Sequence, residues 1–316
     1  MKLWHKTIIA LVIIALIIAG ALWWIPFHEL SKGQLAIIGY SNSGPSLYLL
    51  NPLFRSWSRL QTDNLFPWRM AWSPNGEKIA FTYSTSNDNE ADVVGVAILD
   101  LEKMETQEVY IAPSNEGLNV VTWTLDGHSL VFDVYENNVL TAFRNLDIVT
   151  GKLQSIPFPQ SIQPQYFSVN HLEVAQNNDY VIGGLDGIYI APPNLGNLNP
   201  VTEIGDIDGF FLTSDRKEIT TPCAQSTLCN YSIDTNKLTK TYRGVLPDYG
   251  TFFAGNWSYD EKDVVYLSGG GGEGDPQYIV LVDTQNQQNY TIYKFQDEII
   301  GLGPTGVSQL AWYSEK

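Results

Sequence analysis

The chain is poor in the residues that most often carry catalysis. Its 316 residues include four histidines and two cysteines, and neither a G-x-S-x-G nor an H-E-x-x-H motif occurs. The glycine-rich stretch at 269–274 lacks the Lys-Ser/Thr pair of a phosphate-binding loop. These absences argue against a serine hydrolase, a zinc peptidase and a nucleotide-binding enzyme.

Basic residues are also scarce. Lys and Arg number 18 against 34 Asp and Glu, so the formal net charge is −16. Nucleic acids and anionic lipid surfaces would repel such a chain. We therefore expect no nucleic acid partner, and we interpret the acidity mainly as a source of solubility.

One long apolar run opens the chain. Residues 7–24 carry no charge, and as a helix they would span roughly 27 Å, close to the thickness of a bilayer core. Lys2 and Lys6 precede the run, which predicts a cytoplasmic N-terminus. We predict a cytoplasmic tail (1–6), a transmembrane signal anchor (7–25), a linker (26–33) and an exported domain (34–316), periplasmic or extracellular. The alternatives are a signal peptide cleaved near Ala19-Gly20-Ala21 and a buried soluble helix.

Both cysteines lie in the stretch TTPCAQSTLCNYS, at Cys223 and Cys229. An exported domain meets an oxidising compartment, so we predict a disulfide that stabilises the domain by roughly 2 kcal/mol. No histidine lies near the pair, which disfavours a zinc site. We expect no metal and no other cofactor.

The stretch MAWSPNGEKIAFTY (70–83) predicts a β-hairpin. Ser73, Pro74, Asn75 and Gly76 suit the four positions of a type I turn, and strand-forming residues follow. The same pattern recurs along the chain, in some places in degraded form. We call the last residue of the strand before each turn the anchor residue. The six anchors are about 48 residues apart on average: Trp72, Trp123, Val174, Leu212, Trp257 and Trp312. A second polar turn follows four of the hairpins and begins at Asp100, Asp147, Asp234 and Asp283.

Each period therefore holds four strands, which is the blade of a β-propeller. The C-terminal segment supplies only an inner strand, and the segment after the apolar run lacks one. Joining residues 309–312 to residues 35–38 completes a sixth blade and closes the ring. We predict an all-β, six-bladed propeller preceded by one transmembrane helix.

The W-S-P-N-G hairpin followed by an I-A-F strand resembles the TolB-like, or WD-repeat-like, propeller repeat of exported bacterial proteins. The match is good at 70–83 and 121–132, fair at 254–266 and poor around 174 and 212. The pattern of blades covers about residues 34–316. The resemblance implies the fold and says little about function, because propellers host many activities.

Loops between the second and third strands, and between blades, would share one face of such a propeller. We nominate this acidic rim for recognition. Its candidate binding residues are Asp88, Glu90, Asp92, Asp206, Asp208, Phe210, Glu273 and Asp275. The alternating acids at 88–92 and 206–208 lack the glycine and the final Glu of an EF-hand loop, so they do not predict a calcium site.

The favoured hypothesis is a membrane-anchored, extracytoplasmic scaffold that binds a protein or a cell-envelope component without catalysis. The alternative is a carbohydrate-active enzyme, a glycosidase or lyase that uses carboxylates at the channel mouth. It predicts two carboxyl groups roughly 5 to 9.5 Å apart. A sensor is a third hypothesis, and its six-residue cytoplasmic tail would need another membrane subunit to pass on a signal.

Overall fold

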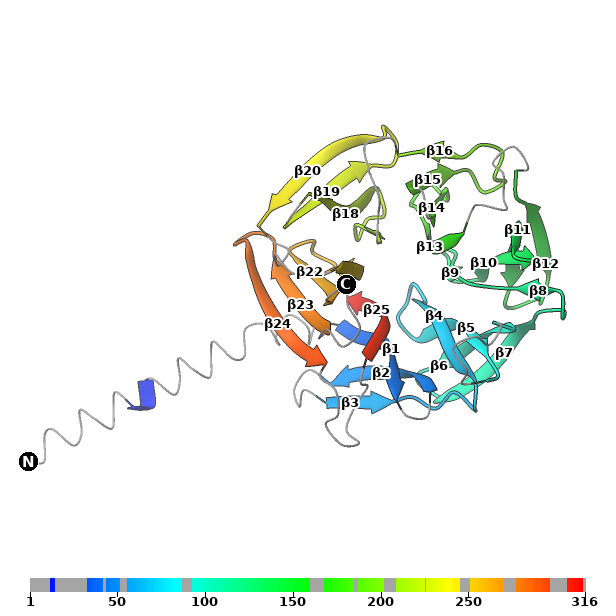
Figure 1. Ribbon diagram of the computed structural model, residues 1–316, viewed down its shortest axis with the longest axis horizontal. Coiled ribbons are helices and arrows are strands. Elements are labelled where there is room, and N and C mark those ends of the chain that lie inside the picture. The colour runs from blue at the N-terminus through cyan, green and yellow to red at the C-terminus, as the bar shows by residue number, and fades with distance from the viewer. Residues whose placement is uncertain are drawn as a thin grey trace, which may run out of the picture.

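A computed structural model of the chain shows six four-stranded units arranged around a central axis (Figure 1). It describes residues 12–14, 33–41, 44–51, 56–86, 93–159, 168–184, 187–201, 209–224, 226–244, 251–269, 277–295 and 306–314. Every pairing within a unit is antiparallel, so each unit is a blade that runs from an inner strand at the axis to an outer strand. The predicted six-bladed propeller is confirmed.

The first three blades follow the order of the sequence. Blade 1 contains β4 (Phe66–Trp72), β5 (Lys78–Ser84), β6 (Gly95–Asp100) and β7 (Glu105–Ile111). Blade 2 contains β9 (Val121–Trp123), β10 (Ser129–Glu136), β11 (Val139–Asp147) and β12 (Leu153–Pro157), and β8 (Glu116–Gly117) also pairs with β10. Blade 3 contains β13 (Val169–Val174), β14 (Tyr180–Gly184), β15 (Gly187–Ala191) and β16 (Asn199–Pro200).

The last three blades include the one that joins the two ends of the domain. Blade 4 contains β17 (Phe211–Leu212), β18 (Glu218–Ala224), β19 (Thr227–Ser232) and β20 (Lys237–Arg243). Blade 5 contains β21 (Thr251–Trp257), β22 (Asp263–Gly269), β23 (Gln277–Asp283) and β24 (Gln288–Phe295). Blade 6 contains β25 (Gly306–Ser314), β1 (Gly33–Ser41), β2 (Gly44–Asn51) and β3 (Ser56–Arg59).

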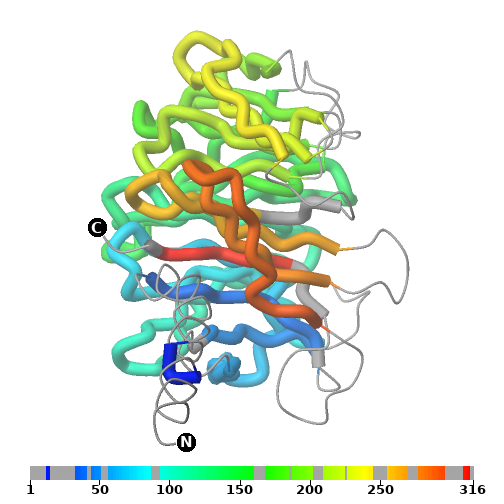
Figure 2. Tube along the Cα trace, turned by 90° about the vertical axis from the view of Figure 1, so that its left-hand side faces the viewer, coloured from blue at the N-terminus to red at the C-terminus, as the bar shows by residue number. Residues whose placement is uncertain are grey.

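Closure of the ring occurs in the predicted register. The C-terminal strand β25 pairs with β1 so that Trp312 lies opposite Leu35 and Ala311 lies opposite Ala36. Figure 2 shows these two strands side by side, although they come from opposite ends of the domain. The pairing gives β1 a strand neighbour on each side, β25 and β2, and so joins the first and last parts of the described domain in one blade.

The inner-strand hairpins share one hydrogen-bonded turn. In five blades the amide of the fourth turn residue donates to the carbonyl of the first, as Gly76 does to Ser73. The fourth residue has positive φ each time, whether it is Gly76 (72°), Gly127 (70°) or a non-glycine such as Arg216 (57°). In four turns a Ser or Thr hydroxyl also accepts the amide five residues on. The repeat inferred from the sequence is therefore a repeat of turn chemistry.

The second set of polar turns follows the prediction in three blades. Asp100, Asp147 and Asp283 each accept backbone amides of their own turn. In blade 4 the residue that does this is Ser232, whose hydroxyl accepts the amide of Thr235, so Asp234 was the wrong assignment. The strand ends two residues before Asp234, and Ser232 therefore occupies the first turn position.

The hydrophobic core lies between blades. Each of six buried clusters joins two neighbouring blades, for example Phe81 of blade 1 with Ile38 of blade 6. Three anchor tryptophans add hydrogen bonds across these junctions: Trp72 donates to the Ala311 carbonyl (3.1 Å), Trp123 to the Ala71 carbonyl (3.1 Å) and Trp257 to the Thr220 hydroxyl (2.7 Å). These anchor side chains thus connect neighbouring blades.

The two faces of the disc differ in their connections. We call the side with the turns after inner strands and after third strands the turn face; residues 73–76, 101–104 and 258–261 lie there. The opposite side is the loop face, where residues 136–138 lie. Gly33 and Ser314 are paired at the turn face, so the propeller begins there.

The predicted transmembrane helix lies mostly outside the described residues. Residues 12–14 are helical and exposed. In the part of the chain that the structure describes, no helix is long and apolar enough to cross a membrane. The anchor stays a prediction.

Candidate functional site

A cavity of about 340 Å³ lies in the central channel. The inner strands of all six blades line it, namely β4, β9, β13, β17, β21 and β25. Residues of the inner-strand turns, including Pro74, Ser214 and Tyr259, also line it, so the cavity reaches the turn face. Its size falls within the usual range of small-ligand sites.

One side of the cavity carries an ion-pair cluster from blades 3 and 4. Arg216 Nη1 lies 3.2 Å from Glu173 Oε2 and donates to the Val174 carbonyl at 2.8 Å. His171 Nε2 lies 3.4 Å from Glu173 Oε1. Burial acts to raise the pKa of Glu173, but the imidazole of His171 and the positive charge of Arg216 outweigh it and lower that pKa. Glu173 is therefore an ionised carboxylate whose charge is neutralised by its neighbours.

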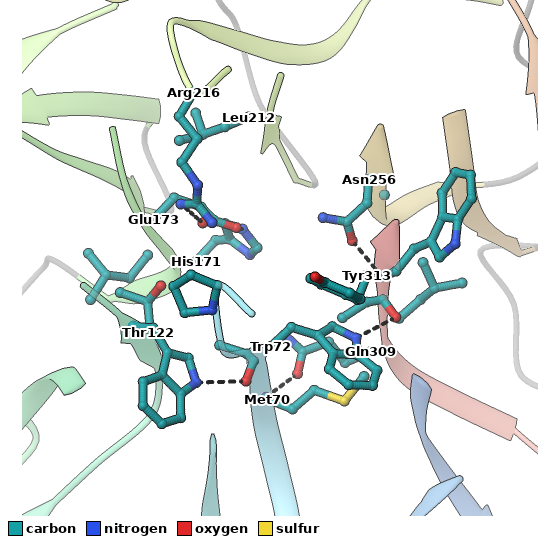
Figure 3. A pocket seen from close by; sticks show the side chains of 18 of the residues that line it. Met70, Trp72, Thr122, His171, Glu173, Leu212, Arg216, Asn256, Gln309 and Tyr313 are labelled. Atoms are coloured by element: carbon teal, nitrogen blue, oxygen red, sulfur yellow. Dashed lines mark hydrogen bonds and ion pairs between the residues drawn. The ribbon is translucent and has the colours of Figure 1, made fainter. Parts of the chain in front are cut away.

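The other side presents amides from blades 5 and 6 (Figure 3). Asn256 Oδ1 accepts the backbone amide of Trp312 at 3.1 Å, and Gln309 Oε1 accepts that of Met70 at 2.5 Å. Each side-chain oxygen is thus used in joining one blade to the next. The NH₂ groups remain as donors, and Figure 3 shows the Asn256 amide directed toward the open centre.

Channel-lining positions follow a simple rule relative to the anchors. Side chains alternate along a strand, and in blades 1, 2, 3 and 6 the positions one and three before the anchor line the cavity. Glu173 and Asn256 lie one residue before their anchors, whereas Arg69, His171 and Gln309 lie three residues before theirs. Sequence reasoning missed these residues because it looked for binding residues in the loops of the rim. Polar residues at those two positions were the signal that could have identified them.

Most of the nominated rim lies outside the described residues. This holds for Asp88, Glu90, Asp92, Asp206, Asp208, Glu273 and Asp275. Phe210 is described: its side chain is 1% exposed and its ring meets His171 edge-on at 4.6 Å, in the core between blades 3 and 4. The Cys223–Cys229 disulfide is confirmed, and it joins the end of β18 to the neighbouring strand β19. Among the described residues no group of three or more His, Cys, Asp or Glu could hold a metal.

Comparison with known proteins gives likenesses of fold. TolB from Acinetobacter baumannii superposes with a TM-score of 0.61 at 15% identity, over 89% of this chain and 66% of that one. The fold is that of a TolB-like propeller. An oligogalacturonate lyase in complex with manganese gives 0.56 at 12% identity (87% and 77% covered). The β-propeller domain of Cps50 (Swd1) from Myceliophteria thermophila gives 0.55 at 9% identity (85% and 83%).

No family model matches the chain, and no curated protein does. The resemblance inferred from the turn motif is therefore confirmed at the level of fold. Because these identities are low, and because TolB and an oligogalacturonate lyase share the architecture, the likeness of fold does not choose between a scaffold and an enzyme.

Proposed function

We propose that the protein is a membrane-anchored, extracytoplasmic propeller that binds a protein or a cell-envelope component and performs no chemistry of its own. The observation that carries this proposal is the composition of the channel. The described lining offers amide donors and aromatic rings, and its one carboxylate, Glu173, is held by Arg216 and His171. Such a surface can recognise a partner without a reactive group poised for catalysis.

The enzyme alternative needs a different lining. Glycoside hydrolysis uses two carboxyl groups that face each other across the substrate. Within the described part of the lining Glu173 has no second carboxylate opposite it. The fold likeness to an oligogalacturonate lyase nevertheless makes one assay necessary, namely cleavage of oligogalacturonate by the purified chain.

Under this proposal the turn face lies toward the membrane. The predicted anchor joins β1 at Gly33, on the turn face, through a linker of eight residues that reaches at most about 29 Å. Three exposed apolar side chains, Met104, Val149 and Tyr259, also lie on that face, and a fourth, Ile111, lies at the loop face. The cavity mouth would then look toward components at or in the membrane.

Photo-crosslinking in native membranes tests the proposal. A photoreactive amino acid at Tyr259 samples the cavity mouth, and one at Asp88 samples the rim. Gln107, on the exposed outer strand β7, provides the control position. We expect a discrete adduct from Tyr259 or Asp88 and none from Gln107. Absence of discrete adducts at both test positions, or cleavage of oligogalacturonate, would overturn the proposal.

A further inference from the structure

Arg69 places at the central cavity a positive charge that forms no ion pair with a described residue. Its guanidinium makes one hydrogen bond, from Nη1 to the Trp68 carbonyl at 3.2 Å, and no ion pair with any carboxylate that the structure describes. Burial lowers the pKa of Arg69, while the nearby Tyr40 and Asp133 oppose that effect electrostatically. The group still stays charged at neutral pH, because an arginine in a protein does not lose its proton. Most of its five N–H donors have no acceptor among the residues that the structure describes.

Two side-chain amides lie on the inner strands of the two blades that precede the blade of Arg69. The Gln309 side chain is bonded to the amide of Met70, the residue after Arg69, and Asn256 is bonded to the strand that carries Gln309. Each amide oxygen already accepts one backbone N–H, which orients the side chain and leaves its NH₂ group as a donor for the cavity. The described residues provide no acceptor for either NH₂ group. Blades 5, 6 and 1 thus present donors and positive charge together.

The ion-pair cluster from blades 3 and 4 does not neutralise the charge of Arg69. Glu173 lies across the channel with Arg216, which already neutralises it (Figure 3). In a chain of net charge −16, a channel segment with an unpaired arginine and without a free carboxylate among its described residues is unusual. An isolated, partly desolvated cation is stabilised when an anion binds beside it.

We propose that the central cavity binds the anionic group of a small ligand, a carboxylate or a phosphate, through Arg69, Asn256 and Gln309. Arginine presents a planar fork that suits both groups, and charge-assisted hydrogen bonds to them are about twice as strong as neutral ones. The cavity volume suits a ligand of about monosaccharide size. This site goes beyond the proposed function, because it depends neither on a membrane anchor nor on a protein partner.

Calorimetric titration of the purified chain with three matched sugars tests the proposal. Glucose, glucuronate and glucose 6-phosphate share one ring and differ in the group at its last carbon. We expect at least one of the two anionic sugars to bind about tenfold or more tightly than glucose. Binding of only one of them distinguishes a carboxylate ligand from a phosphate ligand. If neither binds more tightly than glucose, the proposal is wrong.

Variants assign the binding to the three residues. Arg69→Gln should weaken binding of the preferred sugar about tenfold or more. Arg59→Gln, an equal change of charge on the exposed outer strand β3, should leave it unchanged. Asn256→Asp keeps the acceptor for the Trp312 amide but replaces the donor with a negative charge, so it should also weaken binding. If Arg69→Gln does not fold, Asn256→Asp decides. Unchanged binding in the folded variants would overturn the assignment, whatever the crosslinking experiment yields.

Discussion

Single indole N–H groups join neighbouring blades. Trp123 is buried and donates to the Ala71 carbonyl of the preceding blade, one residue before the anchor of that blade. Trp312 occupies the equivalent place in blade 6, equally buried, but its Nε1 has no hydrogen-bond partner. The two tryptophans therefore differ in one hydrogen bond and agree in position and burial.

Trp123→Phe should be more destabilising than Trp312→Phe. Both changes remove the same ring atoms from a buried site, but only the first leaves the Ala71 carbonyl without its donor. We expect the free energy of unfolding to fall by about 1 to 2 kcal/mol more for Trp123→Phe. Urea unfolding of both variants measures the difference. Equal losses would show that the indole bond contributes nothing measurable.

Asp133 is a fully buried carboxyl group on β10. Its Oδ1 accepts the amides of Asn119 (2.8 Å) and Val120 (2.9 Å) and so fixes the chain that enters β9. Burial raises the pKa of Asp133 to about 7, although these two hydrogen bonds act in the opposite direction. In the unfolded chain the same group has a pKa of about 3.9.

Asp133→Asn should flatten the dependence of stability on pH. Between about pH 4 and pH 7 the native chain keeps a proton that the unfolded chain releases, so the free energy of unfolding falls as the pH rises. The total loss is on the order of 2 to 4 kcal/mol. Asparagine retains the acceptor oxygen and cannot ionise. Unfolding at pH values below and above this window compares the two proteins, and parallel pH profiles would contradict the assignment.

At the scale of elements, the inner-strand turn requires a left-handed residue at its fourth position. At Gly76 a second constraint applies, because an added Cβ would overlap the ring of Tyr313. Tyr313 in turn packs on Trp72, with ring centroids 5.8 Å apart. The turn of blade 1 is thus packed against the end of the closing strand β25.

Gly76→Ala should cost more than Gly151→Ala. Both glycines have positive φ, at 72° and 70°, so backbone strain of about 1 to 2 kcal/mol is common to the two changes. An added Cβ at Gly151 meets no atom within 4 Å, whereas at Gly76 it displaces Tyr313. We expect a further loss of about 1 to 3 kcal/mol for Gly76→Ala. Chemical denaturation measures both, and equal losses would mean that Tyr313 moves aside freely.

For the whole molecule, the start of β1 decides which face an anchor would hold near a bilayer. Gly33 and Ser314 are paired at the turn face, where the cavity mouth also lies. If the predicted anchor is correct, the rim loops face away from the membrane. The two faces would then meet different partners.

Fluorophores on the two faces can measure this orientation. Val149 on the turn face is 78% exposed and Ile111 at the loop-face end of β7 is 67% exposed, so each can carry a label through a cysteine substitution. In vesicles that contain a lipid with a quencher on its headgroup, we expect stronger quenching of the label at position 149. Equal or reversed quenching would contradict the proposed orientation.

The sequence by itself determined the architecture. Turn chemistry and strand alternation are local, so the hairpins at Ser73 and Thr124 revealed the blade repeat, and the unpaired inner strand at 309–312 revealed the closure. The spacing of Cys223 and Cys229 was sufficient to predict their disulfide. The prediction that Asp234 begins the second turn of blade 4 was wrong by two residues, because local propensity does not resolve the exact end of a strand.

Only the tertiary structure decided which polar residues share the channel. Arg69, Glu173, Asn256 and Gln309 come from four blades and approach one another only when the ring closes. In sequence these polar residues are scattered over four inner strands, and loops seemed the better candidates for recognition. Charge pairing is equally non-local. Glu173 pairs with Arg216, whereas Arg69 forms no ion pair with a described carboxylate, because blades 3, 4 and 1 place these groups at different positions around one axis.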